Sequence, residues 1–187
     1  NTAFGKSALG ASNGDSNTAV GKSVLETNTT GAANTGVGFN SLSANTTVNN
    51  NTAVGAYTLE DNTTGTSNVA VGAGALKNNT TGSSNTAIGL DALQGVSTGA
   101  TSANNVAIGL NSLIAVTTGG TNVAVGNYSM AAMTTGARNV AVGYAALDAA
   151  STTSDNTAIG YDALTANTSG YSNVAVGKDA LKANTEG

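Results

Sequence analysis

The stretch Asn156-Thr-Ala-Ile-Gly160 decides the fold, because close copies of it occur eleven times in the 187-residue chain. Each copy reads Asn, Thr or Val, Ala, Val or Ile, and Gly, with Phe4 and Gly36 as the two departures. A fixed period of this kind is typical of stacked supersecondary units, each in contact only with its neighbours. The copies begin at Asn1, Asn17, Asn34, Asn51, Asn68, Asn85, Asn105, Asn122, Asn139, Asn156 and Asn173. Most lie 17 residues apart, whereas Asn85 and Asn105 lie 20 apart.

The alternation within each copy predicts a short strand. Counting the Asn as position 1, positions 2 and 4 share one strand face, because side chains alternate with period two. Thr and Val have the same shape, so the exchange of Thr86 for Val106 at position 2 predicts that this face is the inner one. Position 3 is Ala in ten copies and Gly in one. We expect this opposite face to pack against neighbouring chains.

The rest of the unit predicts a turn, a second strand and another turn. Position 5 is Gly in all eleven copies, which marks a positive φ or a backbone approach too close for a Cβ. Position 9 is Leu in ten copies and Met130 in one, and so predicts a leucine column inside the stack. Turn chemistry follows, as in Asn28-Thr-Thr-Gly31. Asn side chains at position 1 should bond to one another along the stack.

The sequence therefore predicts an all-β chain, a parallel β-solenoid of eleven rungs of about 17 residues. Residues 1–187 form a single repeat array, which we expect to be a segment of a longer fibre. Its middle, residues 96–150, is irregular: position 12 is Asn in most rungs but becomes Val96, Val116, Met133 and Ala150 there. A three-residue expansion lies around Thr101 to Ala103. The change is either an apolar patch packed within the stack or trimer, or a local contact surface.

Composition excludes several classes of function. The net charge is −4, only 9% of residues are charged, and the six basic residues are scattered, so a nucleic-acid partner is not expected. No apolar run is long enough for a membrane span, so we expect no membrane insertion in this segment. The chain has no Cys and no His, and no nucleophile–base set can be assembled. We expect no enzyme, no catalytic residues, no metal site and no cofactor.

Individual motifs are better explained by the repeat than by a site. Val71-Gly-Ala-Gly74 lacks the strand–loop–helix context of a phosphate loop. The glycosylation sequons at Asn28 and Asn62 follow from the repeat composition, and ladder or turn Asn explains them better. Five acidic residues fall at different repeat positions and lack the nonapeptide calcium pattern, so they are interpreted as surface charge. They are Glu60, Asp61, Asp148, Asp155 and Asp162.

Exposed aromatic residues are the other candidates for binding, since aromatic rings stack on sugars. They are Phe39, Tyr57, Tyr128, Tyr144 and Tyr161, and they scatter among the rungs. No single one is favoured, and the ligand-binding residues stay unassigned.

The phrases Asn139-Val-Ala-Val-Gly143 and Asn105-Val-Ala-Ile-Gly109 resemble the head repeats of trimeric autotransporter adhesins, the YadA-like left-handed β-roll. The longer unit Asn156-Thr-Ala-Ile-Gly-Tyr-Asp-Ala-Leu164 is similar to repeats of phage and bacterial tail-fibre proteins. The resemblance covers nearly the whole chain, although the unit here is longer than in the adhesin heads. It implies a homotrimeric fibre that is extracellular, on a cell surface or on a virion tail, and that meets a glycan or protein receptor on a host.

The expected function is a structural and adhesive one: a stiff trimeric spacer, or a receptor-binding shaft. In the alternative, the repeat surface itself binds glycans or ice. Regular Thr ladders on a flat face can match a water lattice. Against ice binding, the Thr pair at positions 13 and 14 is expected in a turn, and the Thr at position 2 on the inner face.

Overall fold

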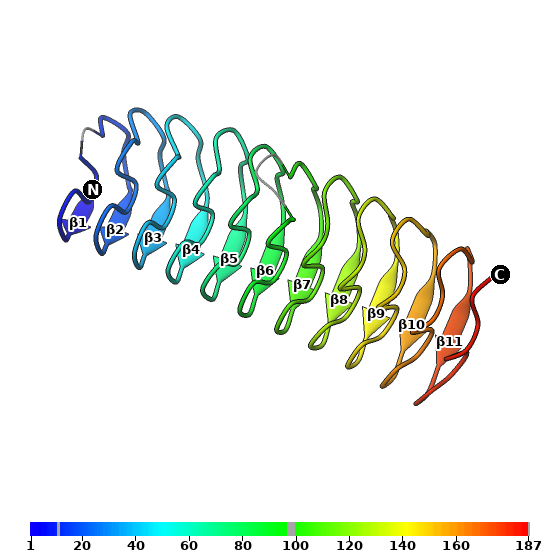
Figure 1. Cartoon of the computed structure of the whole chain (residues 1–187). Helices are drawn as coiled ribbons and strands as arrows, with labels where there is room; N and C mark the ends of the chain where they lie inside the picture. Colours follow the sequence, from blue (N-terminus) through cyan, green and yellow to red (C-terminus); the bar gives the residue numbers. More distant parts are fainter. Residues whose placement is uncertain (11, 97–99, 187) are drawn as a thin grey trace.

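The computed structural model describes residues 1–10, 12–96 and 100–186. This part of the chain contains no helix, and each repeat unit contributes one short strand to a single parallel sheet. Successive turns of the chain stack as the rungs of a solenoid (Figure 1), which we number after their strands. The strands are β1 (Thr2–Phe4), β2 (Thr18–Val20), β3 (Thr35–Val37), β4 (Thr52–Val54), β5 (Val69–Val71), β6 (Thr86–Ile88), β7 (Val106–Ile108), β8 (Val123–Val125), β9 (Val140–Val142), β10 (Thr157–Ile159) and β11 (Val174–Val176). The predicted parallel β-solenoid is confirmed.

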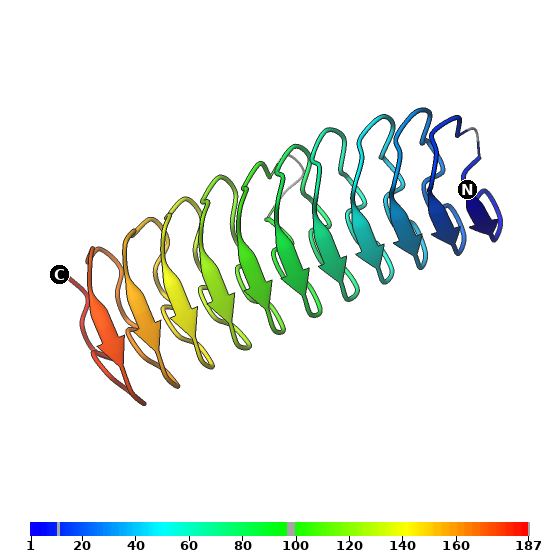
Figure 2. The same cartoon turned by 180° about the vertical axis from the view of Figure 1, so that it is seen from behind.

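The sheet keeps the register of the repeat from end to end. Ala3 lies opposite Ala19, and Thr157 opposite Val174. The strand order is β1 to β11 without a crossover, and the arrows lie side by side along the molecule (Figure 2). Like residues therefore form columns that run along the stack.

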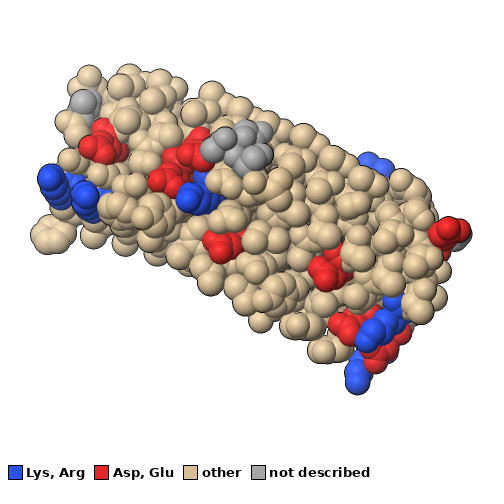
Figure 3. Space-filling model, in the orientation of Figure 1, with Lys and Arg blue, Asp and Glu red and all other residues tan. Residues whose placement is uncertain are grey.

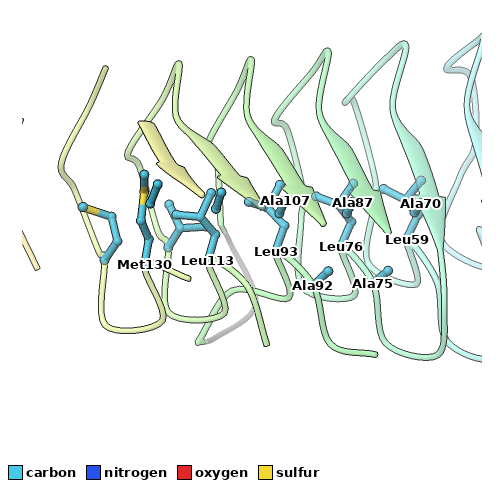
Figure 4. Packing of buried hydrophobic residues seen from close by; sticks show 14 of the residues in the cluster. Leu59, Ala70, Ala75, Leu76, Ala87, Ala92, Leu93, Ala107, Leu113 and Met130 are labelled. Atoms are coloured by element: carbon cyan, nitrogen blue, oxygen red, sulfur yellow. The ribbon is translucent and has the colours of Figure 1, made fainter. Parts of the chain in front are cut away.

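The inner and outer faces of the strand are the reverse of the sequence prediction. Ala19, Ala53 and Ala87 at position 3 are fully buried inside the solenoid. Positions 2 and 4 point outward, and Ile88 at position 4 is 40% exposed. The reason is the width of the interior, because the leucine column at position 9 fills it and leaves room only for a methyl group on the facing strand. Ala70, Ala87 and Ala107 lie next to Leu59, Leu76 and Leu93 in Figure 4.

The leucine side of the rung is not a second strand, which corrects another prediction. Leu25 has a φ of 50° and Ser23, two residues earlier, a φ of 56°. These left-handed residues alternate with other conformations, so the segment cannot adopt the extended geometry of a strand. It still pairs with its neighbours: the Leu25 N–H donates to the Ser41 carbonyl at 3.1 Å, and the Ser23 N–H to the Lys6 carbonyl at 2.9 Å. The buried leucine column itself is confirmed, with Leu42 and Leu59 fully enclosed.

Asn at position 1 forms a buried ladder, with bonds that differ in part from the prediction. The Oδ1 atom of Asn51 accepts the backbone N–H of Asn68 at 3.0 Å, and the Asn51 Nδ2 donates to the Gly65 carbonyl at 3.0 Å. Direct side-chain contacts are fewer, as between Asn139 Nδ2 and Asn122 Oδ1 at 3.1 Å. Asn51 therefore ties its own rung closed and also holds the backbone of the next rung.

Position 12 forms a second inner column whose chemistry changes along the stack. In the early rungs it is polar, since Asn45 Nδ2 donates to Asn28 Oδ1 at 2.9 Å. Val116, Met133 and Ala150 replace Asn in rungs 7 to 9 and are completely buried. For these three residues the apolar patch packed within the stack is confirmed.

Val96 does not belong to this patch, which corrects its assignment to position 12. It is 62% exposed, and the rung resumes its pairing at Ala100, opposite Asn79. The extra residues of the long repeat therefore precede Ala100 and do not lie at Thr101 to Ala103. Residues 97–99 of the irregular stretch lie outside the described residues. The sheet continues unbroken from β6 to β7.

Candidate functional surfaces

The described surface offers no enclosed site. No pocket is found within residues 1–10, 12–96 and 100–186. Nor does this part of the chain bring together three or more acidic, His or Cys side chains that could hold a metal ion. The stacked rungs present columns of like residues on the outside, and these columns are the candidate surfaces.

The outward strand face is made of two of these columns. It consists of the residues at positions 2 and 4 of β1 to β11, all of them Thr, Val, Ile or Phe, and none of them is charged. Val54, Val71 and Ile108 are about as exposed as Ile88, at 36–37%. Parallel sheets normally have both faces covered, because both faces are apolar. Here the outer face is open in the single chain.

The charged residues lie away from the strand face, mainly on the segment that follows the Gly turn. In Figure 3 they occupy small patches, with acidic and basic atoms next to one another. The Lys77 ammonium lies 3.5 Å from the Glu60 carboxylate, and the Lys182 ammonium 2.6 Å from the Asp162 carboxylate. The hydrogen bonds that Lys182 donates to Asp162 and Asp179 raise its pKa above the usual value. Opposite charges thus compensate locally.

The five acidic residues considered in the sequence do not form one site. Burial raises the pKa of Asp61, and the neighbouring Glu60 adds to the rise. Burial also raises the pKa of Asp148, to which the charge of Asp162 contributes. The exposed Asp155 behaves oppositely, since a bidentate hydrogen bond from Arg138, at 2.7 and 2.8 Å, lowers its pKa.

The Thr-rich turn is partly committed to holding rungs together. The position 13 hydroxyl of Thr63 donates to the Thr80 carbonyl at 3.0 Å, and Thr134 donates to Ser151 at 2.9 Å. The next residue, as at Thr64, is exposed. The Thr pair lies in a bend, as predicted.

The sequons at Asn28 and Asn62 are inaccessible. Both side chains are fully buried and donate to the carbonyls of Gly31 and Gly65, each at 2.9 Å. The interpretation of these residues as ladder or turn Asn is confirmed. The Gly-rich Val71–Gly74 stretch likewise serves the rung: a Cβ on Gly72 would collide with the Gly89 carbonyl of the next rung.

The aromatic residues do not scatter, contrary to the sequence interpretation. Two clusters form, because positions 6 and 7 of successive rungs stack on one another. Phe39 and Tyr57 meet edge to face with ring centroids 5.1 Å apart. Tyr144 lies between Tyr128 and Tyr161, at centroid distances of 5.9 and 5.2 Å. Sorting the sequence into repeat columns, rather than along the chain, could have revealed both clusters.

No protein family, curated protein or solved structure matches this chain. Among the described residues there is also no helix long and apolar enough to cross a bilayer.

Proposed function

We propose that this chain is a segment of a homotrimeric fibre, and that it acts as a stiff, non-catalytic spacer or shaft with an adhesive role. The observation that carries the proposal is the uncharged outward strand face, which runs through all eleven rungs. Its position 4 column is apolar in every rung, and a continuous apolar column of this kind marks an interaction site. The partner that fits this face best is another copy of the same chain, because the columns of identical chains have the same period and length.

The corrected orientation of the strand moves the interface from the Ala face to the Val and Ile face. Ala19 and its equivalents are already covered within the chain, so they leave nothing for a neighbour to bury. Val71 and Ile88 are only partly covered. Burial of these side chains between chains stabilises the assembly by about 25 cal/mol for each Å² of apolar surface removed from water, and the gain recurs in every rung.

The stoichiometry and the location rest on the resemblance of Asn139–Gly143 to trimeric adhesin and tail-fibre repeats. In a closed cyclic assembly every chain buries the same face, and no copy of that face is left open to bind further chains. An extracellular, cell-surface or virion location with a glycan or protein receptor on a host follows from the same resemblance.

Light scattering on the purified chain tests the assembly. A mass of three chains is expected for the unaltered protein. Ile88→Glu places a charge in the outward face, and should give monomers that keep the β circular-dichroism spectrum. Thr64→Glu adds the same charge to an exposed turn and should stay trimeric. A well-folded monomer of the unaltered chain would overturn the proposal.

Ice binding is a second candidate, because the structure places the Thr of position 2 on the outside. Thr18, Thr35 and Thr52 follow one another in rungs 2 to 4 of the outer face. The column is then interrupted by Val, as at Val69 and Val106. Ice binding and trimerisation would use the same face, so they exclude each other. Thermal hysteresis from a monomeric chain would favour ice binding over the trimeric fibre.

A further inference from the structure

Three tyrosines from successive rungs are in contact at the surface. Tyr128, Tyr144 and Tyr161 belong to rungs 8, 9 and 10 and form what we name the tyrosine cluster. The planes of Tyr144 and Tyr161 are stacked at 12° to each other, and Tyr128 meets Tyr144 edge to face at 71°. Their centroid distances, 5.2 and 5.9 Å, are those of aromatic rings in direct contact. The rings are therefore immediate neighbours, although about one repeat of chain separates them.

The backbone holds these neighbours side by side. The Asp162 N–H, directly after Tyr161, donates to the Tyr144 carbonyl at 3.0 Å. The Ala145 N–H, directly after Tyr144, donates to the Asn127 carbonyl at 3.1 Å. Groups held together in this way react at a high effective concentration, because they lose no translational freedom when they meet. A reaction between two of these rings is thus favoured over a reaction between separate molecules.

The same rings are accessible from solvent. Tyr128 is 36% exposed, Tyr144 46% and Tyr161 50%. An oxidant in solution can therefore take an electron from each ring, and the proton released with it passes to water. Exposed side chains also change rotamer within picoseconds to nanoseconds, so that two stacked rings can separate and bring their edges together.

Contact between two phenols permits oxidative coupling to dityrosine. A one-electron oxidant removes one electron and one proton from each of two tyrosines, which leaves two phenoxyl radicals. The unpaired electron of each radical lies partly on the ring carbons next to the C–O bond, and two such carbons pair to form a carbon–carbon bond. The hydrogen on each of these carbons then moves to the phenol oxygen and restores the ring. In total two electrons and two protons leave the pair, and hydrogen peroxide takes them up to become two molecules of water.

We propose that the tyrosine cluster is a covalent modification site, at which hydrogen peroxide and a peroxidase join Tyr144 to one of its two neighbours as dityrosine. Tyr144 is the shared member, because it contacts both of the other rings. The bond links two successive rungs within one chain. It closes a loop about one repeat long, and so stabilises the array chiefly by restricting the unfolded chain. The inference goes beyond the proposed fibre function and does not depend on the trimer.

The remaining aromatic pair among the described residues is an internal control. Phe39 and Tyr57 meet with their centroids 5.1 Å apart, and Tyr57 is 39% exposed, so contact and exposure resemble those of the cluster. Phe39 has no phenol and forms no phenoxyl radical. Tyr57 should therefore stay uncoupled under conditions that join Tyr144 to a neighbour.

The test treats the full chain, in dilute solution, with a peroxidase and hydrogen peroxide. Cleavage before each aspartate then places Tyr161 in the fragment 155–161, and Tyr128 and Tyr144 together in the fragment 91–147. Dityrosine fluorescence is expected, with fragment 91–147 either joined to 155–161 or crosslinked internally, in both cases with two hydrogen atoms lost. Trypsin cleaves after Arg138, between Tyr128 and Tyr144, and identifies the internal crosslink. The melting temperature of the coupled chain should rise by about 5–10 °C.

Tyr144→Phe removes the shared phenol and keeps the ring, so it should abolish the crosslink. Tyr57→Phe is the matched control and should leave the yield of dityrosine unchanged. The inference is overturned if no dityrosine forms, if Tyr57 is coupled as fully as Tyr144, or if Tyr144→Phe gives the same yield. Denaturing electrophoresis must show the mass of one chain, and products of two chains in its place would also overturn it. Light scattering before oxidation reports the trimer separately.

Discussion

At the scale of single residues, the interior is set by complementary sizes in adjacent rungs. Gly36 is the one glycine at position 3, and it lies opposite Val24, a larger residue than the Ala or Ser usual at position 8. A Cβ on Gly36 would collide with Cγ1 of Val24. The departure from the repeat at one position is thus explained by a departure at the other.

This pairing predicts a compensating double variant. Gly36→Ala alone should destabilise the chain by about 1–3 kcal/mol, because it overfills the core. Val24→Ala alone leaves a small cavity and should also destabilise it. Together they restore the Ala–Ala pair of other rungs, so the double variant should be more stable than Gly36→Ala. Urea denaturation of the four proteins measures the coupling, and simple additivity would contradict the explanation.

A half-buried carboxylate gives a pH-dependent prediction. Burial raises the pKa of Asp148 in the folded chain. Its contribution to stability is therefore fully present below the ordinary carboxyl pKa and is lost as the pH rises through the raised value. Asp148→Asn should stabilise the chain at pH 7 by about 1 kcal/mol or less, and the gain should vanish at acidic pH.

The control is Asp155→Asn, which removes the exposed partner of Arg138. The pKa of Asp155 is lowered, so any small effect should have the opposite sign. Thermal unfolding of both variants, measured at steps of about half a pH unit between pH 3 and 7, shows whether the two stability changes have opposite signs.

At the scale of the rung, the unusual element is the backbone outside the strand. Left-handed residues recur at positions 7, 9 and 17, among them Leu42 with φ of 54° and Ala33 with φ of 56°. Each costs about 1–2 kcal/mol in a residue other than Gly, Asn or Asp. Hydrogen bonds to adjacent rungs offset the cost, as where the Leu42 N–H donates to the Thr58 carbonyl at 3.0 Å.

Position 17 offers a direct test of this cost. Asn50 and Asn104 occupy it in other rungs with φ of 63° and 59°. Because Asn tolerates this conformation, Ala33→Asn should stabilise the chain by about 0.5–1 kcal/mol. Ala32→Asn, one residue earlier and outside the left-handed region, should not. The denaturation midpoints of the two variants decide the matter, and equal gains would argue against backbone strain as the cause.

At the scale of the whole molecule, stability is a sum over rungs and their contacts with neighbours. Leu164 in rung 10 is fully buried, whereas Leu181 in rung 11 is 48% exposed, since no further rung covers it. Hydrogen exchange should therefore be fastest in rungs 1 and 11 and slowest near β6. Mass spectrometry of exchanged peptides measures the gradient, and uniform protection would mean that the array opens as one unit.

Much of the architecture could be predicted from the sequence, because the Gly of position 5 and the Leu of position 9 recur with a fixed period along the chain. Which face of the strand points inward could not be predicted. The exchange of Thr86 for Val106 at position 2 fits an inner slot, yet the same residues suit the partly covered outside of a sheet. Only the width of the interior, which the leucines determine, decides between an inner and an outer placement of these residues. The left-handed leucines carry no local signal, since neighbouring rungs impose their conformation.

The candidate site was harder to find for a related reason. Tyr128, Tyr144 and Tyr161 are well separated along the chain, and Tyr128 occupies position 7 whereas the other two occupy position 6. They meet only because rungs 8 to 10 lie next to one another in the stack. In the same way, the identity of Val96 as an exposed residue depends on where the longer repeat places its extra residues.

The Asn ladder has a consequence for how such a chain can change its length. The bond from the Asn51 N–H to Asn34 Oδ1 and the bond from the Asn68 N–H to Asn51 Oδ1 are both 3.0 Å long. Deleting residues 51–67 would bring Asn68 to Asn34 with the same geometry. Recombination between repeats in the gene can thus lengthen or shorten the molecule in uniform steps of about 4.8 Å. Each such change reuses the kinds of contact that already exist between rungs, so the length of the array can change during evolution while its structure is kept.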